Sequence, residues 1–214
     1  MICVSVAEES PAACRAALEG EELVEIRLDG MTVTLKEIHE LFSLPLRLIA
    51  THRPGIKGDT RRKIELQTAI EAGAAYVDIE IEADEEYRKE LVAAARAREC
   101  EVIISYHDHN GTPPRDELVT IVDRCFSIGA DLAKVACQTH TPGENARILS
   151  LYELGKPLVA FGMGKAGKLT RVAAPLLGAP FTYAAPAKGK ETAPGQLDLK
   201  TMRQLLNLLT NGTV

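Results

Sequence analysis

A single lysine, Lys134, lies within the apolar run LAKVAC at 132–137, which is short enough to form one buried β-strand. Burying an unpartnered ammonium group is costly because the charged form loses its hydration. A lysine in such a place favours its neutral form, and a neutral amine in an apolar pocket is a nucleophile toward carbonyl carbon atoms. The sequence therefore predicts amine chemistry at Lys134.

Other side chains that could take part in this chemistry lie at or near the ends of other apolar runs. An imidazole can move protons near neutral pH, and the planar fork of an arginine suits a carboxylate. Carboxylate and hydroxyl groups suit the hydroxyl groups of a substrate. The candidates are His107, Glu25, Arg27, Arg53 and Arg171.

Short strand-like runs alternate with longer helical patterns from one end of the chain to the other. Gly20, Gly73 and Gly129 stand where three of the helices should end. Strict alternation predicts a parallel sheet, and eight repeats predict closure into a compact (β/α)₈ TIM barrel, one catalytic domain over residues 1–214. The predicted strands span 2–6, 23–29, 46–51, 76–81, 101–108, 132–137, 157–163 and 181–185.

Two of the predicted strands have one apolar and one charged face, since alternate side chains point to opposite sides. Both faces of a barrel strand are normally buried, so a charged face indicates the barrel interior, where charges can pair with one another or with a ligand. For the acidic residues of 76–82 we favour structural ion pairs with nearby arginines over catalysis. The charged sets are Glu25, Arg27 and Asp29, and Asp78, Glu80 and Glu82.

The composition excludes several classes of protein. A net charge of −5, a pI near 5.6 and 4% aromatic residues without tryptophan argue against nucleic-acid binding. The apolar start MICVSV is too short for a signal peptide or a membrane span. Five scattered cysteines without a Cys-x-x-Cys pair indicate reduced core residues in a cytoplasmic protein, without a disulfide framework or a zinc site.

Six segments, in this order and at successive strand ends, resemble one family of enzymes. They are VEIRLD at 24–29, THR at 51–53, SYHD at 105–108, ADLAKVA at 130–136, GMGKAGKLTR at 162–171 and TAPGQ at 192–196. The chain resembles type I 3-dehydroquinate dehydratase, a Schiff-base lyase of the shikimate pathway of aromatic amino acid biosynthesis, over nearly its whole length.

The resemblance implies a function for each matching residue. Lys134 would form the imine, and His107 would act as general acid and base in the loss of water that turns 3-dehydroquinate into 3-dehydroshikimate. No metal or organic cofactor is implied, since the lysine supplies the electron sink, and a cytoplasmic homodimer is expected. The implied substrate-binding residues are Ser5, Glu25, Arg27, Arg53, Arg171, Thr192 and Gln196.

The chain departs from the family pattern at two positions. Thr192 replaces a serine, which keeps the hydroxyl group. Lys57 stands where the family commonly has a glutamate that orients the catalytic histidine. Either another carboxylate, Glu80 or Asp59, takes over that task, or the enzyme works without it.

Three other interpretations fit part of the sequence. A class I aldolase also uses a lysine on a late barrel strand but breaks a carbon–carbon bond. A metal-dependent hydrolase is suggested by His107-x-His109, although His109 should lie in a loop and His52 and His140 are expected to be exposed loop residues. The third is a barrel that binds the ligand without turning it over.

The Pro-, Gly- and Lys-rich segment 183–196 is predicted to be a mobile lid.

Overall fold

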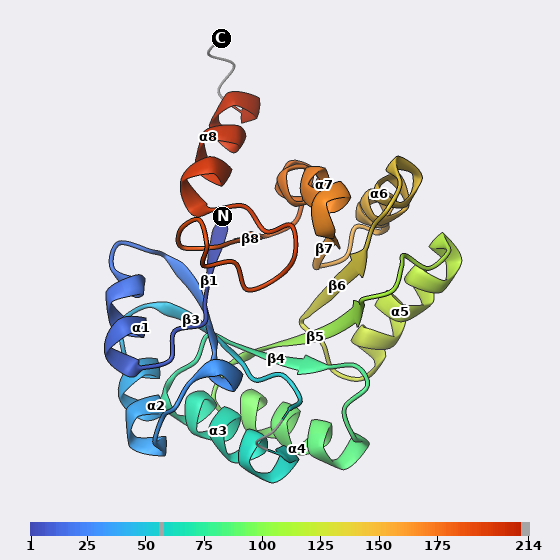
Figure 1. The fold of residues 1–214 in the computed structure, drawn as a ribbon. Coiled ribbons are helices and arrows are strands. Elements are labelled where there is room, and N and C mark those ends of the chain that lie inside the picture. Colours follow the sequence, from blue (N-terminus) through green and yellow to red (C-terminus); the bar gives the residue numbers. More distant parts are fainter. Residues whose placement is uncertain (56–57, 211–214) are drawn as a thin grey trace. The chain divides into compact units, whose positions relative to one another are not determined.

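The computed structural model describes residues 1–55 and 58–210. Along these residues eight strands and eight α-helices alternate, which is the element order of a (β/α)₈ barrel (Figure 1). The strands are β1 (Ile2–Val6), β2 (Leu23–Arg27), β3 (Arg47–Thr51), β4 (Tyr76–Glu80), β5 (Glu101–Asp108), β6 (Leu132–Gln138), β7 (Leu158–Met163) and β8 (Thr182–Ala184). The helices are α1 (Pro11–Leu18), α2 (Leu35–Phe42), α3 (Gly58–Ala72), α4 (Glu85–Arg96), α5 (Arg115–Ser127), α6 (Pro142–Leu149), α7 (Gly164–Leu176) and α8 (Leu199–Thr210).

The described residues form two compact units. The terminal unit comprises residues 1–5, 106–124 and 133–210, and the central unit comprises residues 6–105 and 125–132. The expectation of one catalytic domain over residues 1–214 stays a prediction.

In the central unit, β2, β3, β4 and β5 are consecutive parallel neighbours. The register pairs Thr51 with Asp78 and Glu80 with Ser105. Helices α2, α3 and α4 lie side by side next to these strands (Figure 1). The register thus brings polar side chains of successive strands to the same level.

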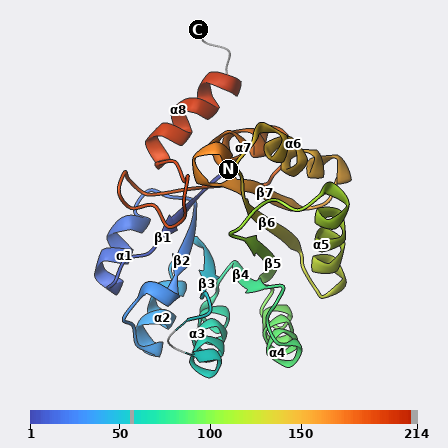
Figure 2. The ribbon, with the colours of Figure 1, turned by 45° about the vertical axis from the view of Figure 1, so that its right-hand side comes forward.

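In the terminal unit, β6 pairs with β7 and β1 pairs with β8, again in parallel. Helices α6 and α7 pack against β7 and against each other (Figure 2). The sharp change from β7 to α7 occurs at Gly164, which has a φ of 77°. This turn places the first residues of α7 close to the end of β7.

The capping side chains of Ser10, Thr34, Asp59 and Asp84 precede helical patterns in the sequence and predict helix starts there. Three of these four predictions are confirmed. Ser10, Thr34 and Asp84 are N-cap residues whose side chains accept backbone N–H groups. Asp59 is not a cap, because α3 begins one residue before it. The starts of α6 and α7 were not located from the sequence, although Thr141 and Glu144 form a capping box that marks the start of α6.

Two further expectations can be compared with the structure. Gly20, Gly73 and Gly129 have positive φ, as helix-ending glycines should. All five cysteines are buried, which confirms that they are core residues, and burial raises the pKa of the Cys14 thiol to about 11. In the described part of the chain, no helix has both the length and the apolar character needed to cross a membrane.

Candidate active site

Lys134 is the third residue of β6, and its side chain is buried, with a relative exposure of 4%. Its neighbours in the strand are apolar. The Nζ atom lies 4.3 Å from the centre of the Tyr183 ring, which projects from β8. The sequence correctly predicted a buried lysine on a strand, but it gave no sign of this aromatic partner.

His107 is the second-last residue of β5, the strand next to β6. Its ring stacks on that of His109, with ring centres 6.3 Å apart and an angle of 11° between the planes. His109 is exposed and lies just beyond the strand, as predicted. The half-buried imidazole of His107 therefore lies at the end of its strand in the terminal unit.

Three of the predicted substrate-binding residues meet in the terminal unit. Thr192 donates a 2.8 Å hydrogen bond from its hydroxyl to the Ser5 Oγ atom. The backbone N–H of Thr192 donates to Gln196 Oε1, also at 2.8 Å. The loop after β8 is thus connected to the end of β1, and the mobility predicted for this loop stays a prediction.

Arg171 lies on α7 and is buried, with a relative exposure of 1%. Its Nη2 atom donates a long, 3.5 Å hydrogen bond to the carbonyl of Pro194, and its guanidinium carbon lies 4.2 Å from the centre of the Phe161 ring. Within the described residues its Nε atom has no hydrogen-bond partner. Burial lowers the pKa of Arg171 to about 10. A buried guanidinium with spare donors is suited to an incoming anion.

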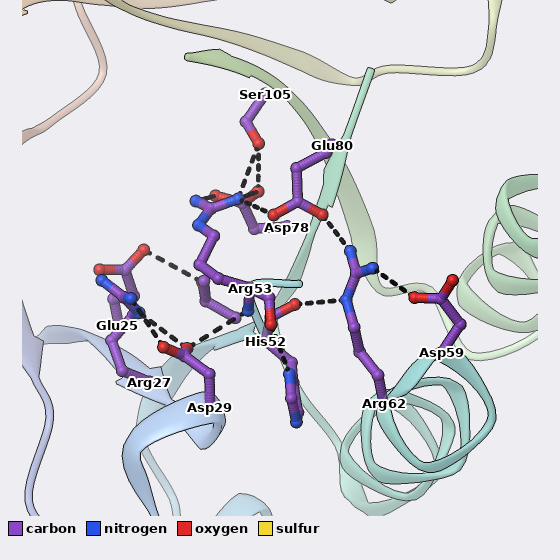
Figure 3. Close-up of polar contacts among 11 residues, drawn as sticks. Glu25, Arg27, Asp29, His52, Arg53, Asp59, Arg62, Asp78, Glu80 and Ser105 are labelled. Carbon is purple, nitrogen blue, oxygen red and sulfur yellow. Dashed lines mark hydrogen bonds and ion pairs between the residues drawn. The ribbon is translucent and has the colours of Figure 1, made fainter. Parts of the chain in front are cut away.

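Arg53 is the centre of a polar network in the central unit (Figure 3). Its two terminal nitrogen atoms donate to the two carboxylate oxygens of Asp78, at 2.9 and 2.8 Å. Nη1 also donates to Glu80 at 2.7 Å and to Ser105 at 3.0 Å. Burial alone would lower the pKa of Arg53, but Asp78 and Glu80 outweigh it and raise that pKa. The ion pair predicted for Asp78 is therefore confirmed.

Arg27 is held by Asp29, just after β2, and Glu25 is held by Thr51 on β3. Arg27 donates from Nε and Nη2 to the two oxygens of Asp29, at 2.9 and 2.8 Å. The hydroxyl of Thr51 donates to Glu25 at 3.0 Å. The strand predicted to reach Asp29 ends at Arg27 instead, because Asp29 turns into a short 3₁₀-helix and also accepts the backbone N–H of Arg53.

Arg62, on α3, connects the network to the neighbouring helix, and the sequence reasoning missed it. It donates to the carbonyl of His52 at 2.7 Å, to Asp59 at 3.0 Å and to Glu80 (Figure 3). The two candidates for orienting His107, Glu80 and Asp59, thus both bind Arg62. Lys57, whose place in the sequence raised this question, lies outside the described residues.

His52 and His140 were both predicted to be exposed loop residues. His140 is exposed, as expected, but His52 is buried, so that prediction was wrong. His52 is buried because its Nε2 atom lies 3.1 Å from the carboxylate of Glu65, which gives the ring a polar partner in the interior. Across residues 1–55 and 58–210, no group of three or more His, Cys, Asp or Glu residues could hold a metal ion.

The order of the elements defines a (β/α)₈ fold, with a buried lysine on its sixth strand. A family model described as type I 3-dehydroquinase matches residues 2–213. The chain belongs to this family, which confirms the resemblance seen in the sequence and the hydro-lyase activity that it implied.

Curated relatives agree with this assignment. The 3-dehydroquinate dehydratase of Methanopyrus kandleri is 36% identical over 208 residues, which cover 92% of each chain. The enzyme of the same name from Thermococcus gammatolerans is 38% identical over 213 residues, covering 96% of this chain and 97% of its own.

Solved structures show the same fold. The type I 3-dehydroquinate dehydratase of Clostridium difficile has a TM-score of 0.87 at 24% identity, covering 99% of this chain and 92% of the other. The 3-dehydroquinate dehydratase of Geobacillus kaustophilus has a TM-score of 0.87 at 22% identity, covering all of this chain and 92% of the other. The predicted (β/α)₈ fold class is confirmed.

Proposed function

We propose that this chain converts 3-dehydroquinate to 3-dehydroshikimate through an imine formed on Lys134. The burial of Lys134 on β6 carries the proposal, because an amine held among apolar strand residues and shielded from water can act as a nucleophile toward a ketone. Membership of the type I 3-dehydroquinase family supports the same chemistry.

The reaction divides into steps that these side chains can perform. The neutral amine of Lys134 adds to the ring ketone, and with one added proton the oxygen leaves as water, giving an iminium ion. The positive nitrogen withdraws electrons, so the proton on the adjacent carbon becomes acidic. His107 removes that proton to give an enamine.

The same imidazolium then protonates the departing hydroxyl group, which is on the second carbon from the iminium carbon, and this completes the elimination of water. Hydrolysis of the conjugated imine releases the product and restores the amine of Lys134. No step requires a cofactor, because the lysine nitrogen accepts the electrons and the histidine carries the proton.

Arg171 is proposed to bind the carboxylate of the substrate. Its guanidinium is buried, and its Nε atom has no hydrogen-bond partner among the described residues. Its contact to Pro194, at 3.5 Å, is weak enough to be replaced by a charged acceptor. The substrate carboxylate would then form an ion pair with the buried guanidinium of Arg171, whose acceptor at Pro194 is weak.

The remaining polar residues are proposed to bind the hydroxyl groups of the ring. Ser5, Thr192 and Gln196 already form one hydrogen-bonded cluster, so substrate hydroxyls would exchange with preformed donors and acceptors. Glu25, Arg27 and Arg53 are also proposed to bind substrate. Their own partners fix the position of each side chain, which lowers the entropic cost of binding.

Borohydride trapping tests this function. The protein is incubated with 3-dehydroquinate and sodium borohydride, and the modified residue is located by peptide mass spectrometry. An adduct on Lys134, absent from Lys134→Met, is expected. If the substrate binds without forming an adduct, the chain is a binding protein only. An adduct formed only with acyclic ketones would instead favour the aldolase interpretation.

We further propose that the protein is a cytoplasmic homodimer. Helices α7 and α8 pack together and expose Leu169, Leu208 and Leu209, each by 60% or more. Covering such side chains is favourable, and a second copy of the chain is the simplest partner. Sedimentation equilibrium should give twice the mass of 23.2 kDa, and Leu208→Asp should shift it to the monomer.

A further inference from the structure

The reacting nitrogen of Lys134 lies against the face of an aromatic ring. Its Nζ atom is 4.3 Å from the centre of the Tyr183 ring, and both side chains are buried. The face of an aromatic ring carries negative charge density and attracts cations, most strongly where water is excluded. This contact therefore acts on the charge of the nitrogen.

The Tyr183 ring is fixed in this orientation by two other rings. Phe161 and Phe181 meet it edge to face, with ring centres 5.9 and 5.4 Å away and angles of 61° and 82° between the planes. Edge-to-face pairs are favourable arrangements that define the direction of a ring plane. The ring face that Lys134 meets is therefore held in place before any substrate arrives.

We propose that Tyr183 is a further catalytic residue whose ring face stabilises the positive nitrogen of the iminium ion on Lys134. The inference rests on the function proposed above. Formation of the iminium joins Nζ to the ketone carbon and releases the oxygen as water, with one proton taken up. Tyr183 forms no bond and exchanges no proton in this step. It favours the charged product over the neutral adduct that precedes it.

The geometry explains why this stabilisation serves the reaction. The nitrogen is positive when the proton on the neighbouring carbon is removed, and again after water has been eliminated. A fixed ring supplies negative charge density without moving, so no reorganisation is needed as the charge develops. A carboxylate at this place would form a tight ion pair with the lysine and keep it protonated, whereas a ring attracts the cation more weakly.

Graded removal of charge density from the ring tests the proposal. Tyr183 is replaced by Phe and by phenylalanines that carry one, two or three fluorine atoms, which weaken the ring face with little change in volume. We expect Tyr183→Phe to keep kcat within about threefold. Across the fluorinated series kcat should fall stepwise, by about tenfold in all, which is the size of one buried cation–π contact.

A second measurement separates this effect from a general disturbance of packing. The fraction of enzyme that carries a borohydride-reducible adduct at saturating 3-dehydroquinate should fall in the same order. As a matched control, the same fluorinated residues are placed at Phe42, a buried residue of α2 outside the proposed site. There kcat and the trapped fraction should not change.

Two results would overturn the inference. The first is a flat series at position 183. The second is a large loss already in Tyr183→Phe, which would assign the effect to the hydroxyl group. The wild-type protein separates this test from that of the proposed function. Without any wild-type adduct both proposals fail, whereas an adduct on Lys134 with a flat series rejects the role of Tyr183 alone.

Discussion

The guanidinium group of Arg53 and the carboxylate of Asp78 form two parallel hydrogen bonds, of 2.9 and 2.8 Å, and Asp78 is fully buried. Such a pair depends on both partners, because either charge left alone in the interior is poorly solvated. The pair fixes Arg53, which lies two residues after β3 and is proposed to bind substrate, to the neighbouring strand β4.

Replacing Asp78 with alanine should therefore cost both stability and binding. We expect the free energy of unfolding to fall by about 3–5 kcal/mol and KM for 3-dehydroquinate to rise, because Arg53 loses its fixed position. Urea unfolding and steady-state kinetics measure the two effects. Asp123→Ala, which removes an exposed partner of Lys156, should change stability by less than about 1 kcal/mol. Equal losses in the two variants would contradict the assignment.

The pair of Arg27 and Asp29 predicts a dependence of stability on pH. Burial alone would raise the pKa of Asp29, but the two hydrogen bonds from Arg27 outweigh it and lower that pKa below its ordinary 3.8. The stabilisation is therefore fully present above about pH 4 and is lost as the pH falls through the lowered pKa. Asp29→Asn should cost about 1.5–3 kcal/mol at pH 6 and clearly less at pH 3. A cost independent of pH, measured by urea unfolding, would refute this.

Arg171 is expected to lower the stability of the folded protein and to increase its affinity for the substrate. Its buried guanidinium is desolvated, and its acceptor at Pro194 is distant. Arg171→Met, which is apolar and of similar length, should raise the melting temperature while KM rises at least tenfold, because the carboxylate loses its cation. Arg171→Lys keeps the charge without the fork and should bind at an intermediate level. A destabilised Arg171→Met protein would show that the guanidinium has a structural task.

Two glycines in the loop after β8 provide a matched pair of variants. Gly195 has a φ of 77°, and a Cβ atom there would lie 2.1 Å from the carbonyl oxygen of Gly164, whereas Gly189 has a φ of 82° and open space around it. Both alanine variants should lose about 1 kcal/mol for the left-handed backbone. Only Gly195→Ala should also raise KM, since it displaces Thr192 and Gln196. Thermal unfolding measures the stability of the two variants, and steady-state kinetics measures their KM. Identical KM values would contradict a role of the loop in binding.

The repeating pattern of the chain allowed most of the fold to be predicted. Alternation of short apolar runs with capped helical segments is a local property, so eight strands could be located to within about two residues. The starts of α6 and α7 were not located, because the capping residues of α6, Thr141 and Glu144, were not recognised and α7 begins without a side-chain cap. The extent of β2 was overestimated, since Asp29 continues the alternation but is drawn out of the strand by Arg27.

By itself, the sequence determined which residue types are available and on which strand they lie. Lys134 in an apolar strand, His107 at a strand end and the order of the motifs were enough to predict the family and its chemistry. The tertiary structure alone decided which groups meet. Asp78 pairs with Arg53, Glu80 with Arg62, and the ring of Tyr183 covers the amine of Lys134. These contacts join residues far apart in the chain, and their geometry depends on strand register and on packing, which no local pattern specifies.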